Sequence, residues 1–125
     1  MSDIKEIEKK VQLYFDSMYE SNPDKVREVF HENARVTGYL PGKLENNLHQ
    51  MTVEEFANFV SSQQPSPKEK KDEVVLEIIS CDVAGLTASV RVRDLYLGMM
   101  FLDTLSFLKT NNEWKIYNKL FHVED

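Results

Sequence analysis

Two aspartates in the last third of the chain have the spacing that acid or base chemistry would need. Asp103 lies between Phe101 and Leu105 in a run where every second residue is apolar, a pattern typical of a strand with one buried face. Burial raises the pKa of a carboxyl group, as a general acid or base requires. We therefore expect Asp103 to be a catalytic acid or base, or an ordinary carboxylate if this end of the strand is open to water.

The expected strand pairing brings a second carboxyl group to the same place. A two-residue turn at Gly98-Met99 sets Asp94 opposite Asp103. Adjacent carboxyl groups repel each other when both are charged, so one of them tends to keep its proton. In the alternative, a bulge turns Asp94 outward toward Arg91 and Arg93, and its role is then structural.

The following turn, at Asn111-Asn112, predicts that Asn118 and His122 share this apolar face. Pairing across the turn sets Asn118 against Leu105 and His122 against Phe101. An imidazole titrates near neutral pH, so His122 could relay a proton while Asn118 orients a substrate. In the alternative, His122 is exposed to solvent. We expect a concave site at the end of the sheet away from Asn111-Asn112.

Other candidates come from elsewhere in the chain. Tyr14, Tyr39 and Tyr96 could each direct a hydroxyl group into the site, where a phenol can stabilise an oxyanion, or they could be core rings with one wet end. His49, like Glu45, belongs to a segment rich in Pro, Gly and Asn, expected to be a loop near the pocket mouth. The expected ligand-binding residues are Tyr14, Tyr39, His49, Asp94, Tyr96, Phe101 and Asn118.

The sequence offers no pattern for a metal or a cofactor. The three histidines, His31, His49 and His122, have no carboxylate partners at ligand spacing. Glycine-rich phosphate loops and a Gly-x-Ser-x-Gly motif are absent, which argues against nucleotide cofactors and serine hydrolysis. We expect no metal and no cofactor.

Composition predicts one compact domain over residues 1–125, because 42% of the residues are hydrophobic and 29% charged. The net charge of −6 and the lack of a basic cluster interrupted by aromatics argue against nucleic acid. Neither a signal-peptide core nor a run of about 20 apolar residues is found. We therefore expect no membrane partner and a cytoplasmic location. The single cysteine, Cys81, excludes an internal disulfide bond.

Apolar spacing and turn residues predict that helices come first and antiparallel strands last, which makes an α+β domain with helices on one face of a curved sheet. The expected order is a helix over 4–18, a short helix after Pro23, a short strand over 31–40, a loop over 41–50, a helix opened by a Thr52–Glu55 capping box, a mobile connection over 63–71, and four strands from Asp72.

With this order, the sequence resembles the nuclear-transport-factor-two-like superfamily, which includes SnoaL-like cyclases, scytalone dehydratase and ketosteroid isomerase. The resemblance is carried by Tyr14-Phe15, Val29-Phe30-His31, the helix over 52–59, and Phe101-Leu102-Asp103 followed by residues 112–121. That ending resembles the branch of small bacterial proteins called putative lumazine-binding. The resemblance implies a cone of three N-terminal helices on a strongly curved, mainly antiparallel sheet, a cystatin-like roll with a pocket at its open end. It also implies a homodimer formed through the outer sheet face.

Superfamily members differ in activity, so three functions stay open. The first is a protein that binds a largely apolar ring compound in the cone. The second is a cofactor-free lyase or isomerase with Asp103 as acid or base and His122 or a tyrosine at the oxyanion. The third is a structural dimer whose cone is filled by Phe56, Phe59, Tyr96 and Phe101.

Overall fold

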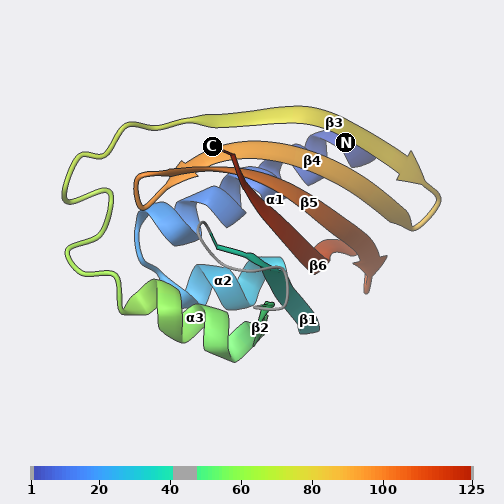
Figure 1. The fold of residues 1–125 in the computed structure, drawn as a ribbon. Coiled ribbons are helices and arrows are strands. Elements are labelled where there is room, and N and C mark those ends of the chain that lie inside the picture. The colour runs from blue at the N-terminus through green and yellow to red at the C-terminus, as the bar shows by residue number, and fades with distance from the viewer. Residues whose placement is uncertain (1, 41–47, 125) are drawn as a thin grey trace.

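The computed structural model describes residues 2–40 and 48–124. Its helices and strands follow one another along the chain as shown in Figure 1. The elements are α1 (Asp3–Tyr19), α2 (Pro23–Val29), β1 (Phe30–Tyr39), β2 (His49–Thr52), α3 (Val53–Ser61), β3 (Leu76–Ala84), β4 (Thr87–Tyr96), β5 (Met99–Thr110) and β6 (Glu113–Glu124).

The strands form one six-stranded sheet in the order β2-β1-β6-β5-β4-β3. Only β1 and β6 run parallel, and the other neighbours are antiparallel. The long strands β3, β4 and β5 curve over α1, and α2 and α3 lie beside one another on the same side (Figure 1). The prediction of an α+β fold with helices on one face of a curved sheet is confirmed.

Helix α1 carries the core of the cone. Its buried stripe of Ile7, Val11, Tyr14 and Met18 recurs at helical spacing and packs with the apolar face of the sheet. Each fully buried side chain of this size stabilises the fold by about 1.5–3 kcal/mol. The first turn is anchored at Asp3, whose Oδ1 accepts hydrogen bonds from Trp114 Nε1 (3.0 Å) and Lys109 Nζ (3.2 Å).

Helix α3 begins where the capping box predicts. The Thr52 hydroxyl accepts from the Glu55 backbone N–H (3.2 Å), and the Glu55 carboxylate accepts from the Thr52 N–H (2.9 Å). This start sets the rotation of the helix, so that Phe56 points toward the sheet while Phe59 stays partly exposed.

The segments expected to be loops are more ordered than their composition indicates. His49 and Gln50 belong to β2, which pairs with β1, so the predicted loop does not extend to residue 50; Glu45 lies outside the described residues. The expected mobile connection over 63–71 instead makes fixed contacts. Ser66 is buried there, and the N–H of Lys68 donates to the carbonyl of Tyr19 (2.9 Å).

The β4–β5 turn lies one residue earlier than predicted. It is formed by Leu97 and Gly98, which both have positive φ (52° and 76°), as the tight turns of twisted hairpins require. The pairing therefore shifts by two residues, so that Asp94 faces Phe101 and Val92 faces Asp103. The predicted pairing of Asp94 with Asp103 is wrong. Because side chains alternate with period two, the shift leaves both aspartates on the buried face.

A bulge in β6 overturns the second predicted register. Phe107 pairs with Ile116 as expected, but Ser106 pairs with Asn118, and Tyr117 is the extra residue. Beyond this bulge, each side chain of β6 points to the face opposite to the one that strict alternation predicts.

Candidate functional site

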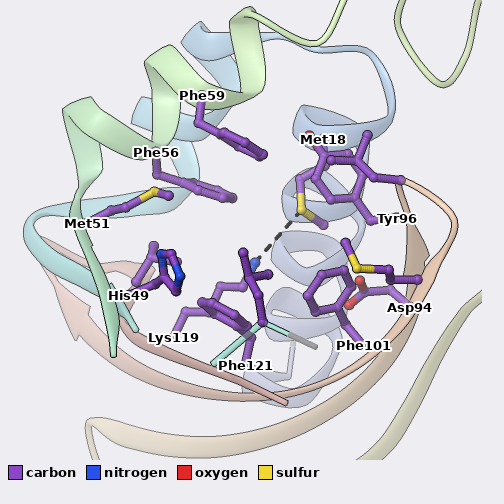
Figure 2. Close-up of a pocket in the computed structure, with 14 residues that line it drawn as sticks. Met18, His49, Met51, Phe56, Phe59, Asp94, Tyr96, Phe101, Lys119 and Phe121 are labelled. Carbon is purple, nitrogen blue, oxygen red and sulfur yellow. Dashed lines mark hydrogen bonds between the residues drawn. The ribbon is translucent and has the colours of Figure 1, made fainter. Parts of the chain in front are cut away.

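A cavity of about 140 Å³ opens at the end of the cone between α3, β2 and the strands β4 to β6. Most of its wall is apolar, and Figure 2 shows Phe56 and Phe59 on one side and Phe101 and Tyr96 on the other. The lining residues are Met18, Val36, Leu40, His49, Met51, Phe56, Phe59, Asp94, Tyr96, Leu97, Met99, Phe101, Lys119 and Phe121.

Two buried carboxyl groups lie at and behind the wall of this cavity. Asp94 lines it, whereas Asp103 does not; both have no solvent exposure. The hydroxyl of Tyr14 donates a short hydrogen bond (2.6 Å) to Asp103 Oδ2. Within the described part of the chain, Asp103 Oδ1, both oxygens of an ionised Asp94 and the Tyr96 hydroxyl are buried without a hydrogen-bond partner.

Protonation of Asp94 satisfies part of this deficit. Burial raises the pKa of the Asp94 carboxyl well above its usual value, and the negative charge of Asp103 and a hydrogen bond with it act in the same direction; Lys119 acts against them. Two carboxyl groups share a hydrogen bond only when one carries the proton. The raised pKa therefore favours the protonated form of Asp94, which can donate a hydrogen bond to Asp103.

The two tyrosines near this pair remain neutral phenols. Burial raises the pKa of Tyr14, and the charges of Asp103 and Asp94 and its hydrogen bond to Asp103 add to the shift. Burial alone raises the pKa of Tyr96. Tyr14 therefore acts as a donor to Asp103, and Tyr96 brings a hydroxyl group to the cavity wall.

The β6 bulge also places Lys119 inside the cavity. Its side chain is almost fully buried, with Nζ 4.7 Å from the ring centre of Phe56, 4.9 Å from that of Tyr14 and 6.0 Å from that of Phe121. Nζ donates a hydrogen bond to Met18 Sδ at 3.9 Å (Figure 2). Strict alternation from the Asn111-Asn112 turn put Lys119 on the outer face, so the sequence carried no signal for this residue.

The structure brings only some of the candidate residues together. His49, Asp94, Tyr96 and Phe101 line the cavity, whereas Tyr14 and Asp103 lie buried behind it. Their roles in binding or catalysis stay predictions.

Three candidates lie elsewhere. Asn118 and His122 were predicted on the concave face, and this is wrong, because the bulge turns both outward; Asn118 borders a shallow hollow with Tyr117, and His122 is exposed. Tyr39, 43% exposed, pairs with His122 at the end of β1 and does not line the cavity.

Residues 2–40 and 48–124 contain no group of three His, Cys, Asp or Glu side chains arranged to hold a metal ion. In the same residues, none of the helices has both the length and the apolar character needed to span a bilayer.

Comparison with known proteins shows which family the sequence belongs to. A family model described as "Putative lumazine-binding" matches residues 2–122. The sequence matches none of the curated proteins.

Several solved structures share the fold across almost the whole chain. An NTF2-like protein of unknown function from Silicibacter pomeroyi is 21% identical, with a TM-score of 0.85, covering 97% of this chain and 95% of that one. One from Methylobacillus flagellatus is 24% identical, with a TM-score of 0.82 and coverage of 98% and 93%. One from Shewanella baltica is 21% identical, with a TM-score of 0.79 and coverage of 100% and 98%. At these identities the likeness establishes the fold alone.

Proposed function

Since the chain belongs to the family described as putative lumazine-binding, within the NTF2-like superfamily, we propose that it binds a small, largely apolar ring compound in the cone. The observation that carries this proposal is the cavity itself, which has apolar walls and only a few polar groups. Concave sites of this kind are the usual places for small-molecule binding.

The size of the cavity limits what fits. At about 140 Å³ it is close to an engineered cavity of about 150 Å³ that accepts benzene. One ring therefore fits without rearrangement. A fused bicyclic ring, such as lumazine, needs a side chain at the rim to move, and Phe59, 36% exposed, is free enough to do so.

A structural dimer with a filled cone is less well supported. Phe56, Phe59, Tyr96 and Phe101 surround an open space instead of closing it. The outer sheet face, with Tyr117 and Leu120 both more than one third exposed, is still the surface on which we expect dimerisation, and this is compatible with a ligand in the cone.

A second candidate function, a cofactor-free lyase or isomerase, is favoured by the buried carboxyl pair. Asp94, not Asp103, is the carboxyl group that a ligand would touch. In this function Asp94 moves the proton, and Asp103 and Tyr14 are positioning residues that hold it in place. His122 has no part in it, because it lies on the outer face.

Filling the cavity tests the binding proposal. Met99 lines the cavity, whereas Met100, its neighbour in β5, does not. We expect benzamide, indole or lumazine to shift the backbone amide NMR signals of cavity residues in the wild type and in Met100→Trp. Met99→Trp should weaken that binding at least about tenfold, because the introduced tryptophan ring occupies the cavity. Wild-type protein that binds none of these compounds, or Met99→Trp that binds like Met100→Trp, would contradict the proposal.

A further inference from the structure

The cavity contains a buried ammonium group that binding of a purely apolar ring does not use. Lys119 is 5% exposed and lines the cavity wall. Charged side chains are rarely buried to this extent unless an opposite charge accompanies them. Among residues 2–40 and 48–124, none forms an ion pair with Lys119.

The groups around Lys119 compensate its charge only in part. The faces of Phe56 and Tyr14, with ring centres 4.7 and 4.9 Å from Nζ, attract a cation. An ammonium group has three N–H donors, and a thioether sulfur such as Met18 Sδ at 3.9 Å is a weak acceptor. Rings and a thioether therefore leave donor capacity for an oxygen atom in the cavity.

The carboxyl group in the same cavity does not fill this role. Burial next to Asp103 raises the pKa of Asp94 and so favours its protonated form, in which the carboxyl group can itself donate a hydrogen bond, although Lys119 acts against this shift. His49 is the remaining ionisable side chain of the wall besides Tyr96. The polar groups of the cavity wall therefore include the Lys119 ammonium group and O–H and N–H donors, whereas the rest of the wall is apolar.

We propose that the ligand of this cavity is a ring compound bearing an anionic oxygen, as a carboxylate, phenolate or enolate, and that the Lys119 ammonium group binds this oxygen. The inference rests on the proposed function and adds the chemical class of the ligand. Figure 2 shows the Lys119 side chain rising from β6 into the space between the aromatic walls. In the proposed complex the ring of the ligand lies against Phe56 and Phe101, and its anionic oxygen accepts a hydrogen bond from Lys119 Nζ.

The arrangement favours an anion because Lys119 is already removed from water in the folded protein. Only the ligand loses hydration on binding, and a charge-assisted hydrogen bond in a water-poor site replaces that hydration. A preorganised cation in an apolar cavity therefore discriminates between a charged ligand and a neutral ligand of the same shape.

Benzoate and benzamide provide that comparison, since they differ chiefly in charge and both fit a one-ring cavity. Dissociation constants come from NMR titration of the amide signals of cavity residues at neutral pH. We expect the wild type to bind benzoate at least about tenfold more tightly than benzamide. Lys119→Met should abolish this preference while keeping benzamide binding, and Lys119→Arg should retain part of it. Lys9→Met, at an exposed position of α1, changes the net charge equally and should leave the preference intact.

The outcomes separate the two proposals. If benzamide binds as tightly as benzoate, or if the preference survives in Lys119→Met, the assignment of Lys119 is wrong while the apolar ring site stands. If neither compound nor the neutral rings bind the wild type, both proposals fail. Should Lys119→Met not fold, Lys119→Arg decides: a reduced preference for benzoate with benzamide binding kept supports the assignment, and an unchanged ratio of the two dissociation constants overturns it.

Discussion

Replacing Asp94 with asparagine tests whether the buried carboxyl group keeps its proton. Asp94 has no solvent exposure, and its pKa is raised well above the usual value by burial and by Asp103. An asparagine amide has nearly the same shape and can donate to Asp103 the hydrogen bond that a protonated Asp94 donates. Asp94→Asn therefore removes one titration while conserving the packing.

The sign of the effect follows from the difference between the two states. In the unfolded chain an aspartate loses its proton at about pH 3.9, whereas the folded chain holds the Asp94 proton to higher pH. The stability of the wild type is therefore fully present below the unfolded pKa and falls as pH rises toward the folded pKa, because only the unfolded state gains by ionising. One proton gives a slope of about 1.4 kcal/mol per pH unit.

Asp94→Asn lacks this loss of stability. The difference in free energy of unfolding between Asp94→Asn and the wild type should therefore grow with pH along that slope, and it should stay constant above the folded pKa of Asp94. For 125 residues, the slope corresponds to about 5 °C in Tm per pH unit. Urea unfolding followed by circular dichroism, from about pH 4 to about pH 8, measures the difference across the expected window.

Asp82→Asn is the matched control, since Asp82 is exposed on β3 and the substitution removes the same formal charge. Its curve should run parallel to the wild-type curve. If the Asp94→Asn curve is also parallel, or falls below the wild type as pH rises, Asp94 is an ionised group with a compensating partner. Asp94 and Asp103 would then share no proton, and the lyase or isomerase function would lack the acid that it needs.

Two further predictions concern the chemistry and the shape of the cavity. If Asp94 moves protons, the wild type should catalyse exchange of the α-hydrogens of 1-indanone with deuterium oxide, because the Asp94 carboxylic acid protonates the carbonyl oxygen while solvent removes the α-proton. Asp94→Asn should lose at least about 100-fold of that rate, as removal of a general acid does; NMR detects the exchange, and an unchanged rate in Asp94→Asn rules out this role. Gly38→Ala should destabilise the fold by about 1–3 kcal/mol or more, because the new Cβ would clash with the carbonyl oxygen of Phe121 and lie 2.6 Å from its ring. Urea unfolding checks this value, and a stability equal to the wild type would mean that β1 and β6 separate easily at the cavity.

Local patterns were enough to place most of the elements. The capping box at Thr52–Glu55 and the proline after Asn22 act through neighbouring backbone groups, so they determine helix starts without help from the rest of the fold. Strand β2 was missed because its four residues are too few to show a period, and it exists through pairing with β1.

The two aspartates show how an incorrect register can still lead to the correct face. The β4–β5 turn was misplaced by one residue, which shifts the pairing by two, and a shift of two preserves the alternation. Their burial could therefore be predicted from the sequence. Which of them reaches the cavity depends on the curvature of the sheet and on Tyr14, which comes from a helix far away in sequence.

Spacing along a single strand or helix was enough to predict the α+β class, the helix starts and a common face of the sheet for Asp94 and Asp103. The tertiary structure decided that Lys119, not Asn118 or His122, enters the cavity. The bulge at Tyr117 lies where a strand must follow both β5 and the parallel strand β1 around a strongly bent sheet. The bulge depends on pairing between segments that are distant in sequence, so the alternation of residues within β6 could not predict it.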